Sequence, residues 1–191
     1  NYNTVVGDEA GTAITTGDGN VAVGYSAGDA LDVGSYNIAV GMNALTADTK
    51  GSTSIAIGYG TLTAQNFTSA TDAHNIAIGH GTGGAVTTGT FNTLIGGLAG
   101  DGATTASYST ALGYGSLGGA MTGEGNVALG VNTLLVATSA HSNTAVGTSA
   151  MSSATTGTNN VAVGRNALDA NTTASNNTAV GYDALGANTT G

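Results

Sequence analysis

The chain contains no cysteine, no proline and no tryptophan, and charged side chains are rare in it. The absence of cysteine excludes disulfides and thiolate metal sites and leaves the redox compartment undetermined. Lys50 and Arg165 are the only strong bases, set against eleven Asp and Glu, for a formal net charge of −9 over 191 residues. This balance argues against nucleic-acid partners, because such proteins need a basic face to neutralise phosphates. It argues equally against an electrostatic contact with anionic lipid.

Long apolar segments are also missing. The longest aliphatic run covers residues 134–137, far short of the about 20 residues that span a membrane, so we expect no membrane insertion by this segment. The 33 glycines would by themselves suggest disorder or a fibrous repeat. Disorder is disfavoured because 40% of the residues are hydrophobic and none is proline.

The glycines are periodic, and their period defines the organisation of the chain. The pattern Asn-x-Ala-Val-Gly recurs, with variations, eleven times, and its closing glycines are Gly7, Gly24, Gly41, Gly58, Gly79, Gly96, Gly113, Gly130, Gly147, Gly164 and Gly181. Nine of the ten intervals are 17 residues, and the one between Gly58 and Gly79 carries a four-residue insertion. The sequence predicts a single repeat array over residues 1–191. We expect a piece of a longer protein, because the array starts and stops at equivalent points without capping units.

Each unit has the pattern of a short β-strand. The residue before the glycine is always aliphatic, the residue two earlier is Val, Ile or Thr, and Ala lies between them in nine of eleven units. This alternation predicts a strand, and a second short element followed by a polar turn completes the unit. Such a unit is typical of one coil of a parallel β-solenoid. Eleven coils would form an all-β rod about 50 Å long.

The expected core is thin. Three aliphatic columns hold 24 large side chains, or just over two per coil. Burying two such side chains does not offset the entropy lost when 17 residues become ordered. We therefore expect one face of the roll to be buried against other chains, with Gly and Ala columns permitting close approach. The sequence predicts a homo-oligomer.

An asparagine stands four residues before most of the closing glycines. We interpret this column as a structural ladder, in which each amide bonds the coils above and below. Ser54 and Ser109 interrupt it. The predicted ladder residues are Asn3, Asn20, Asn37, Asn75, Asn92, Asn126, Asn143, Asn160 and Asn177.

The repeat resembles a known family. The pentapeptides at 20–24, 54–58, 75–79 and 160–164 resemble the head repeat of YadA-like trimeric autotransporter adhesins, and residues 177–191 are similar to arrays in phage tail fibres and bacterial surface proteins. The resemblance covers all eleven units. It implies a left-handed parallel β-roll, three chains packed around a common axis, and adhesion outside the cell, on a cell surface or a virion. This chain departs from the family in its longer coil and in the Thr that replaces the first aliphatic residue in five units.

Aromatic side chains are the candidate binding residues. They recur one residue after and five residues before the closing glycines, and we expect them in bands on the outside or at the corners of the solenoid. They either stack on sugar rings of surface glycans or cover coil edges and seams between chains, and the sequence favours the second role. The insertion should bulge from the rod and expose its own aromatic residue. The aromatic residues singled out are Tyr25, Tyr59, Tyr114, Tyr182 and Phe67.

Catalysis and cofactors are not expected. The acids are scattered, so no acid–base pair can be nominated, and His74 and His80 are not accompanied by a carboxylate at a ligand-like spacing. The sequence favours a trimeric fibre or adhesin segment that acts as a rigid spacer, with the binding of cell-surface glycans as a secondary, less favoured role. The alternatives are a self-assembling extracellular filament and, less favoured, an ice-binding solenoid suggested by threonine pairs.

Overall fold

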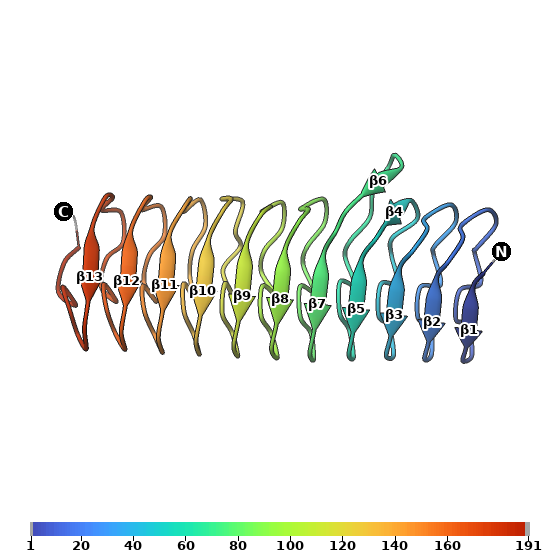
Figure 1. Ribbon diagram of the computed structural model, residues 1–191, viewed down its shortest axis with the longest axis horizontal. Coiled ribbons are helices and arrows are strands. Elements are labelled where there is room, and N and C mark those ends of the chain that lie inside the picture. The colour runs from blue at the N-terminus through green and yellow to red at the C-terminus, as the bar shows by residue number, and fades with distance from the viewer. Residues whose placement is uncertain (1, 190–191) are drawn as a thin grey trace.

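The computed structural model describes residues 2–189; Asn1, Thr190 and Gly191 lie outside the described residues. The described chain contains β-strands and no helix. It forms a parallel β-solenoid whose coils stack side by side into a rod, with the two ends of the chain at opposite ends (Figure 1). The all-β solenoid with 17-residue spacing is thus confirmed. No segment of residues 2–189 forms a helix that could cross a membrane.

One strand per coil builds the main sheet of eleven strands, and two further strands form a small sheet at the insertion. The main sheet comprises β1 (Thr4–Val6), β2 (Val21–Val23), β3 (Ile38–Val40), β5 (Ile55–Ile57), β7 (Ile76–Ile78), β8 (Thr93–Ile95), β9 (Thr110–Leu112), β10 (Val127–Leu129), β11 (Thr144–Val146), β12 (Val161–Val163) and β13 (Thr178–Val180). The small sheet pairs β4 (Gly51–Ser52) with β6 (Thr71–Asp72).

Every neighbouring pair in the main sheet is parallel and in the same register. Val21 pairs with Ile38 at a spacing of 17 residues, and Ile55 pairs with Ile76 across the insertion. Equivalent residues of successive coils therefore stand in columns along the rod. The closing glycines form one such column, and Gly41 shows why: its φ is +131°, and a Cβ there would lie 2.4 Å from the carbonyl oxygen of Gly58.

The larger aliphatic side chains of the strands face away from the core, whereas the sequence placed them inside it. In nine of the eleven strands the central residue is a buried Ala, such as Ala22 or Ala39, whereas the residues on either side of it are half-buried or exposed. Two of the three aliphatic columns expected in the core therefore face outward, and the sequence interpretation was wrong on this point. The physical reason is the width of the coil, because the return limb lies too close to the strand for two columns of β-branched side chains.

Most coils bury one large apolar side chain, four or seven residues after the closing glycine; the exceptions are Leu94, which fills its coil from the strand, and the pair Leu117 and Met121, which are buried together. Where the fourth residue after the closing glycine is Leu45 or Leu134, that side chain fills the core. Where this residue is Gly28, the space goes to Leu31, whose Cδ1 would lie 2.9 Å from a Cβ at the glycine. Close packing of this kind leaves little free volume inside a coil.

The hydrogen bonds between coils locate the insertion more narrowly within the interval from Gly58 to Gly79. Asn66 still bonds Thr49 at a spacing of 17 residues, whereas His74 bonds Thr53 at 21, so the extra residues lie between Asn66 and His74. β6 projects from the rod there (Figure 1). Phe67 was expected to be exposed, but it is only 5% exposed. Its ring packs over Gly51, where a Cβ would lie 2.8 Å from the Phe67 Cδ2.

Candidate functional site

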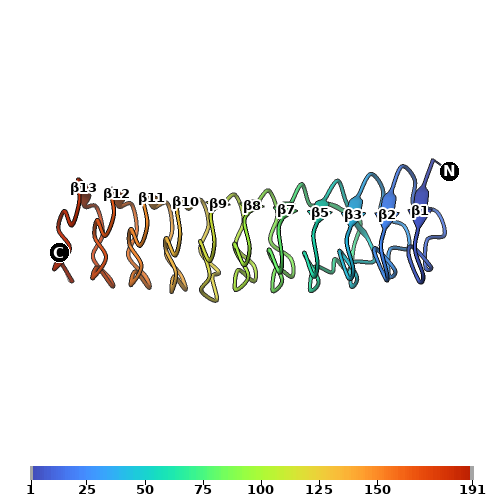
Figure 2. The same ribbon diagram turned by 90° about the horizontal axis from the view of Figure 1, so that it is seen from below.

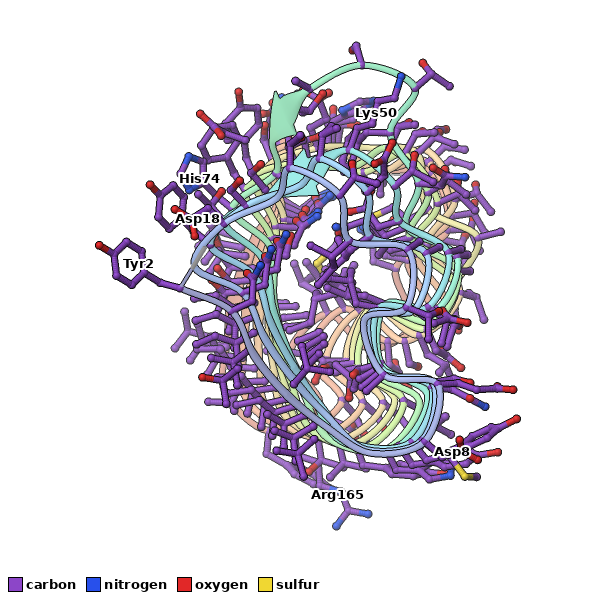
Figure 3. The ribbon with its side chains drawn as sticks, turned by 90° about the vertical axis from the view of Figure 1, so that its right-hand side faces the viewer. Tyr2, Asp8, Asp18, Lys50, His74 and Arg165 are labelled. Carbon is purple, nitrogen blue, oxygen red and sulfur yellow. The ribbon has the colours of Figure 1, made fainter. Side chains whose placement is uncertain are left out.

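The strand limb of each coil presents a flat surface, which we call the outer strand face. Its two central columns are the residues three and one before each closing glycine, which point to the same side as alternate residues of a strand. The residues five before and one after the glycine border these columns and form the two edges of the face. The strands lie in one row along the rod (Figure 2). Viewed down the rod, Tyr2 and His74 project from one end of the strand limb and Asp8 and Arg165 from the other (Figure 3).

The outer strand face gathers nearly all of the exposed apolar surface. Of the 19 large hydrophobic side chains exposed in residues 2–189, 15 lie on it. Its two central columns are aliphatic or Thr, and none of their described residues is fully buried. Asp8 and Arg165 are its only Asp, Glu, Lys or Arg residues, so ten of the eleven acids lie elsewhere. Only four exposed large hydrophobic side chains of residues 2–189 lie on the other surfaces of the rod.

Aromatic side chains line both edges of this face. The four predicted tyrosines lie in the column after the closing glycine, and their exposed fractions rise from 47% at Tyr25 to 71% at Tyr182. Phe67 is the one predicted aromatic residue that the structure does not bring to this face. The opposite edge carries the second aromatic band, of which Tyr36, Phe91 and Tyr108 are exposed members.

Rings in adjacent coils stack on one another. The ring centroids of His74 and Phe91 are 5.0 Å apart and those of Phe91 and Tyr108 are 5.1 Å apart, with interplanar angles of 30° and 5°. On the other edge, Tyr59 and His80 stack at 5.2 Å. A ring between two such neighbours has both faces covered, so it offers only its edge to a ligand. Glycan stacking therefore requires a ring with a free face.

The asparagine column is buried from Asn20 to Asn160 and half-buried at its ends, Asn3 and Asn177, and it forms hydrogen bonds at every coil junction that it spans. Nδ2 of Asn20 donates to the carbonyl of Gly34 (2.8 Å), and its Oδ1 accepts the backbone N–H of Asn37 (2.9 Å). Both bonds go to the following coil, whereas the expected ladder placed them on the coils above and below. Only some members also reach backward, as when Nδ2 of Asn143 donates to Oδ1 of Asn126 (3.2 Å).

A buried polar cluster, which the sequence reasoning missed, lies where Ser54 interrupts this column. Nε2 of Gln65 donates to Oδ2 of Asp48 (2.6 Å) and to the Ser54 hydroxyl (3.0 Å), while its Oε1 accepts from Nδ2 of Asn75 (2.8 Å). Oδ1 of Asp48 accepts the N–H of Gly51 (2.9 Å). The signal was available, because polar residues occupy a repeat position that is Leu31 one coil earlier.

The remaining titratable groups do not converge. His74 and His80 flank one strand, β7, and project from its opposite ends; no group of three or more His, Asp or Glu suited to a metal exists within residues 2–189. Hydrogen bonds from the backbone N–H groups of Tyr2 and Gly19 lower the pKa of Asp18, and burial raises the pKa of Asp101. These two acids are five coils apart, about 24 Å, so they do not form a pair. The described residues also enclose no pocket.

Comparison of the chain with family models, with curated proteins and with solved structures found no match.

Proposed function

We propose that this chain is a rigid segment of an extracellular fibre or adhesin, in which three copies pack side by side through their outer strand faces. Two features of this proposal, the left-handed course of the β-roll and the homotrimer, are implied by the resemblance to YadA-like heads. It places the segment in a phage tail fibre or a bacterial surface appendage. There it acts as a spacer and binds cell-surface glycans.

The outer strand face is the observation that carries the proposal. Eleven coils at about 4.8 Å and six residues at about 3.3 Å give it an area of about 1,000 Å². Its exposed aliphatic and aromatic side chains form a continuous stripe, and large exposed apolar patches mark interaction surfaces on soluble proteins. The area of the face is comparable with the about 800 Å² that each partner contributes to a standard interface. A face of this size in water favours burial against a surface of the same kind.

The distribution of charge favours a second copy of this chain as the partner. A chain of net charge −9 repels its own copies unless its charges stay away from the contact. Here ten of the eleven acids lie outside the outer strand face. Parallel copies can therefore meet through Val, Ile and Leu without desolvating carboxylates.

Rigidity supports the role of a spacer. Each coil is fixed to the next by strand pairing, by the asparagine column and by threonine hydroxyls such as those of Thr87, Thr104 and Thr155, which donate to carbonyls one coil on. Because these hydroxyls are engaged within the rod, they are poor candidates for an ordered ice-binding surface, which argues against the ice-binding alternative.

Light scattering over a concentration series tests the proposal. We expect a constant mass of three times 18.2 kDa. Val146→Glu places a charge on the outer strand face and should yield monomers, because three carboxylates would meet near the axis. Val136→Glu is the matched control, since Val136 is an exposed valine outside that face. It should leave the mass unchanged. A folded wild-type monomer would refute the assembly, and a mass that climbs without limit would favour the filament.

A further inference from the structure

The aromatic band five residues before the closing glycines ends at an open position. His74, Phe91 and Tyr108 stack in consecutive coils at about the coil spacing. The next residue in this column is Gly125, and Ser142 follows it. Phe91 therefore has a ring neighbour on both faces, whereas Tyr108 has one on a single face. Tyr108 is accordingly the more exposed of the two, at 61% against 46%.

The space over Gly125 is empty, whereas the space over the other glycine of this band is filled by a ring. A Cβ built on Gly125 would meet only the Ser142 hydroxyl oxygen, at 3.8 Å. At Gly19, the other glycine of the band, a Cβ would lie 2.7 Å from Cδ1 of Tyr36, because that ring leans over the glycine. Tyr108 instead lies within 5° of parallel to Phe91. Tyr108 and Ser142 lie two coils apart in the same column, a distance of about 10 Å. This distance leaves room for one ring between them.

Polar groups flank this gap. Glu124 precedes Gly125, and its backbone N–H donates to Nδ1 of His141 (3.0 Å). An imidazole that accepts at Nδ1 carries its hydrogen on Nε2, so His141 keeps one N–H donor for another partner. Glu124, His141 and Ser142 are all exposed. The gap thus combines an apolar ring face with an exposed carboxylate, an N–H donor and a hydroxyl nearby.

These groups match the chemistry of a sugar ring better than that of an aromatic ring. A pyranose has C–H groups on one face, which pack on an aromatic ring, and hydroxyls around its edge, which need donors and acceptors. We propose that the gap at Gly125 binds one neutral pyranose residue of a glycan, stacked on the free face of Tyr108. Acidic sugars are disfavoured by Glu124 and by the net charge of the chain.

The site rests on the proposed function, with the trimer contact centred on the aliphatic columns of the outer strand face and the edge that carries Tyr108 and Gly125 left accessible; a fibre would then present one such gap per chain to a cell surface. Three gaps on a trimer convert a weak single contact into avid binding wherever a glycan presents several residues at a suitable spacing. The site differs from the aromatic columns as a whole, because within the stacked rings only edges are available. It also assigns a recognition role to Tyr108, which was not among the tyrosines first singled out.

The test uses the methyl glycosides of glucose, galactose, mannose and N-acetylglucosamine as probes. Binding is followed by the NMR shifts of the tyrosine ring signals, with Tyr108 assigned through Tyr108→Ala. Gly125→Tyr should fill the gap and weaken binding by at least about tenfold. This variant should fold, since the φ of Gly125 is +69° and those of Phe91 and Tyr108 are +58° and +57°. Asn176→Tyr adds a tyrosine to the same column three coils away and should bind like the wild type.

The outcomes separate this site from the assembly. Shifts at Tyr108 with at least one glycoside, lost in Gly125→Tyr and kept in Asn176→Tyr, support the site. No glycoside shift by the wild type overturns it, as does binding that survives Gly125→Tyr. The mass of each sample by light scattering tests the trimer independently. A loss of mass in Gly125→Tyr would show that the gap receives a side chain of a neighbouring copy, which also overturns the proposal.

Discussion

A single ladder asparagine satisfies backbone groups that no other residue can reach. Nδ2 of Asn143 donates to the carbonyl of Gly157 (2.8 Å), and its Oδ1 accepts the N–H of Asn160 (2.9 Å). Asn143 is fully buried, so water cannot replace either bond. A serine at this position retains part of the function, because Oγ of Ser109 accepts the N–H of Asn126 (3.3 Å).

Replacement of Asn143 should therefore be costly in a graded way. Asn143→Ala leaves a buried carbonyl and a buried N–H without partners, and each such group costs about 1–3 kcal/mol. We expect the free energy of unfolding to fall by about 2–5 kcal/mol in Asn143→Ala and by about half of that in Asn143→Ser. Urea unfolding measures both. Equal losses in the two variants would mean that side-chain volume, and not hydrogen bonding, sets the stability of this column.

At the scale of the element, most coils bury one large apolar side chain, which comes from one of two positions in the repeat. Polar residues are tolerated only where they satisfy one another. Gln65 does this for the insertion coil, because it bonds the Asp48 carboxylate, the Ser54 hydroxyl and the Asn75 amide at once. Asp48 and Gln65 are both fully buried. The cluster therefore replaces the ladder amide that Ser54 cannot supply.

Gln65→Leu should destabilise the insertion coil strongly. It leaves a buried carboxylate without its side-chain donor, and a hydrogen bond to a charged group contributes about 1.5–3 kcal/mol. The double variant Asp48→Leu with Gln65→Leu should recover part of this loss, since it removes the buried carboxylate together with its donor. Hydrogen exchange of amides near β4, β5 and β7 reports the change locally. A double variant less stable than Gln65→Leu alone would contradict the role of the buried charge.

The sequence predicts the coil and its strand well, but it does not predict which face of the strand points into the core. Stacked coils place equivalent residues in columns, so the period and the strands around Ala22 or Ala39 can be found from spacing alone. The inward face cannot, because both Val23 and Ala22 suit a strand and hydrophobicity alone favours burial of valine. One signal was available: Asp8 and Arg165 stand at the same parity as the aliphatic columns and mark that side as outward. Phe67 escaped prediction because its burial depends on a neighbouring coil, through Gly51.

At the scale of the whole molecule, the outer strand face joins the stability of a chain to its assembly. Its aliphatic columns leave large side chains in water in the single chain, while each interior coil buries about one. If three faces meet, most of this surface is removed from water on association. Folding then draws on contacts that an isolated chain does not have, as in obligate oligomers.

The stability of the wild-type chain should consequently depend on its concentration. For a folded trimer in equilibrium with three unfolded chains, each tenfold rise in concentration raises the free energy of unfolding by about 2.7 kcal/mol per trimer. This is twice the about 1.36 kcal/mol that corresponds to a factor of ten. Thermal unfolding over a hundredfold concentration range measures this. Val146→Glu should abolish the dependence and Val136→Glu should keep it.

Because the outer strand face carries only Asp8 and Arg165 as charged residues, sodium chloride should change the association of the chains little, whereas sulfate should strengthen that association. A concentration dependence that persists unchanged in Val146→Glu would instead place the contacts at the ends of the rod, at the open edges of β1 and β13.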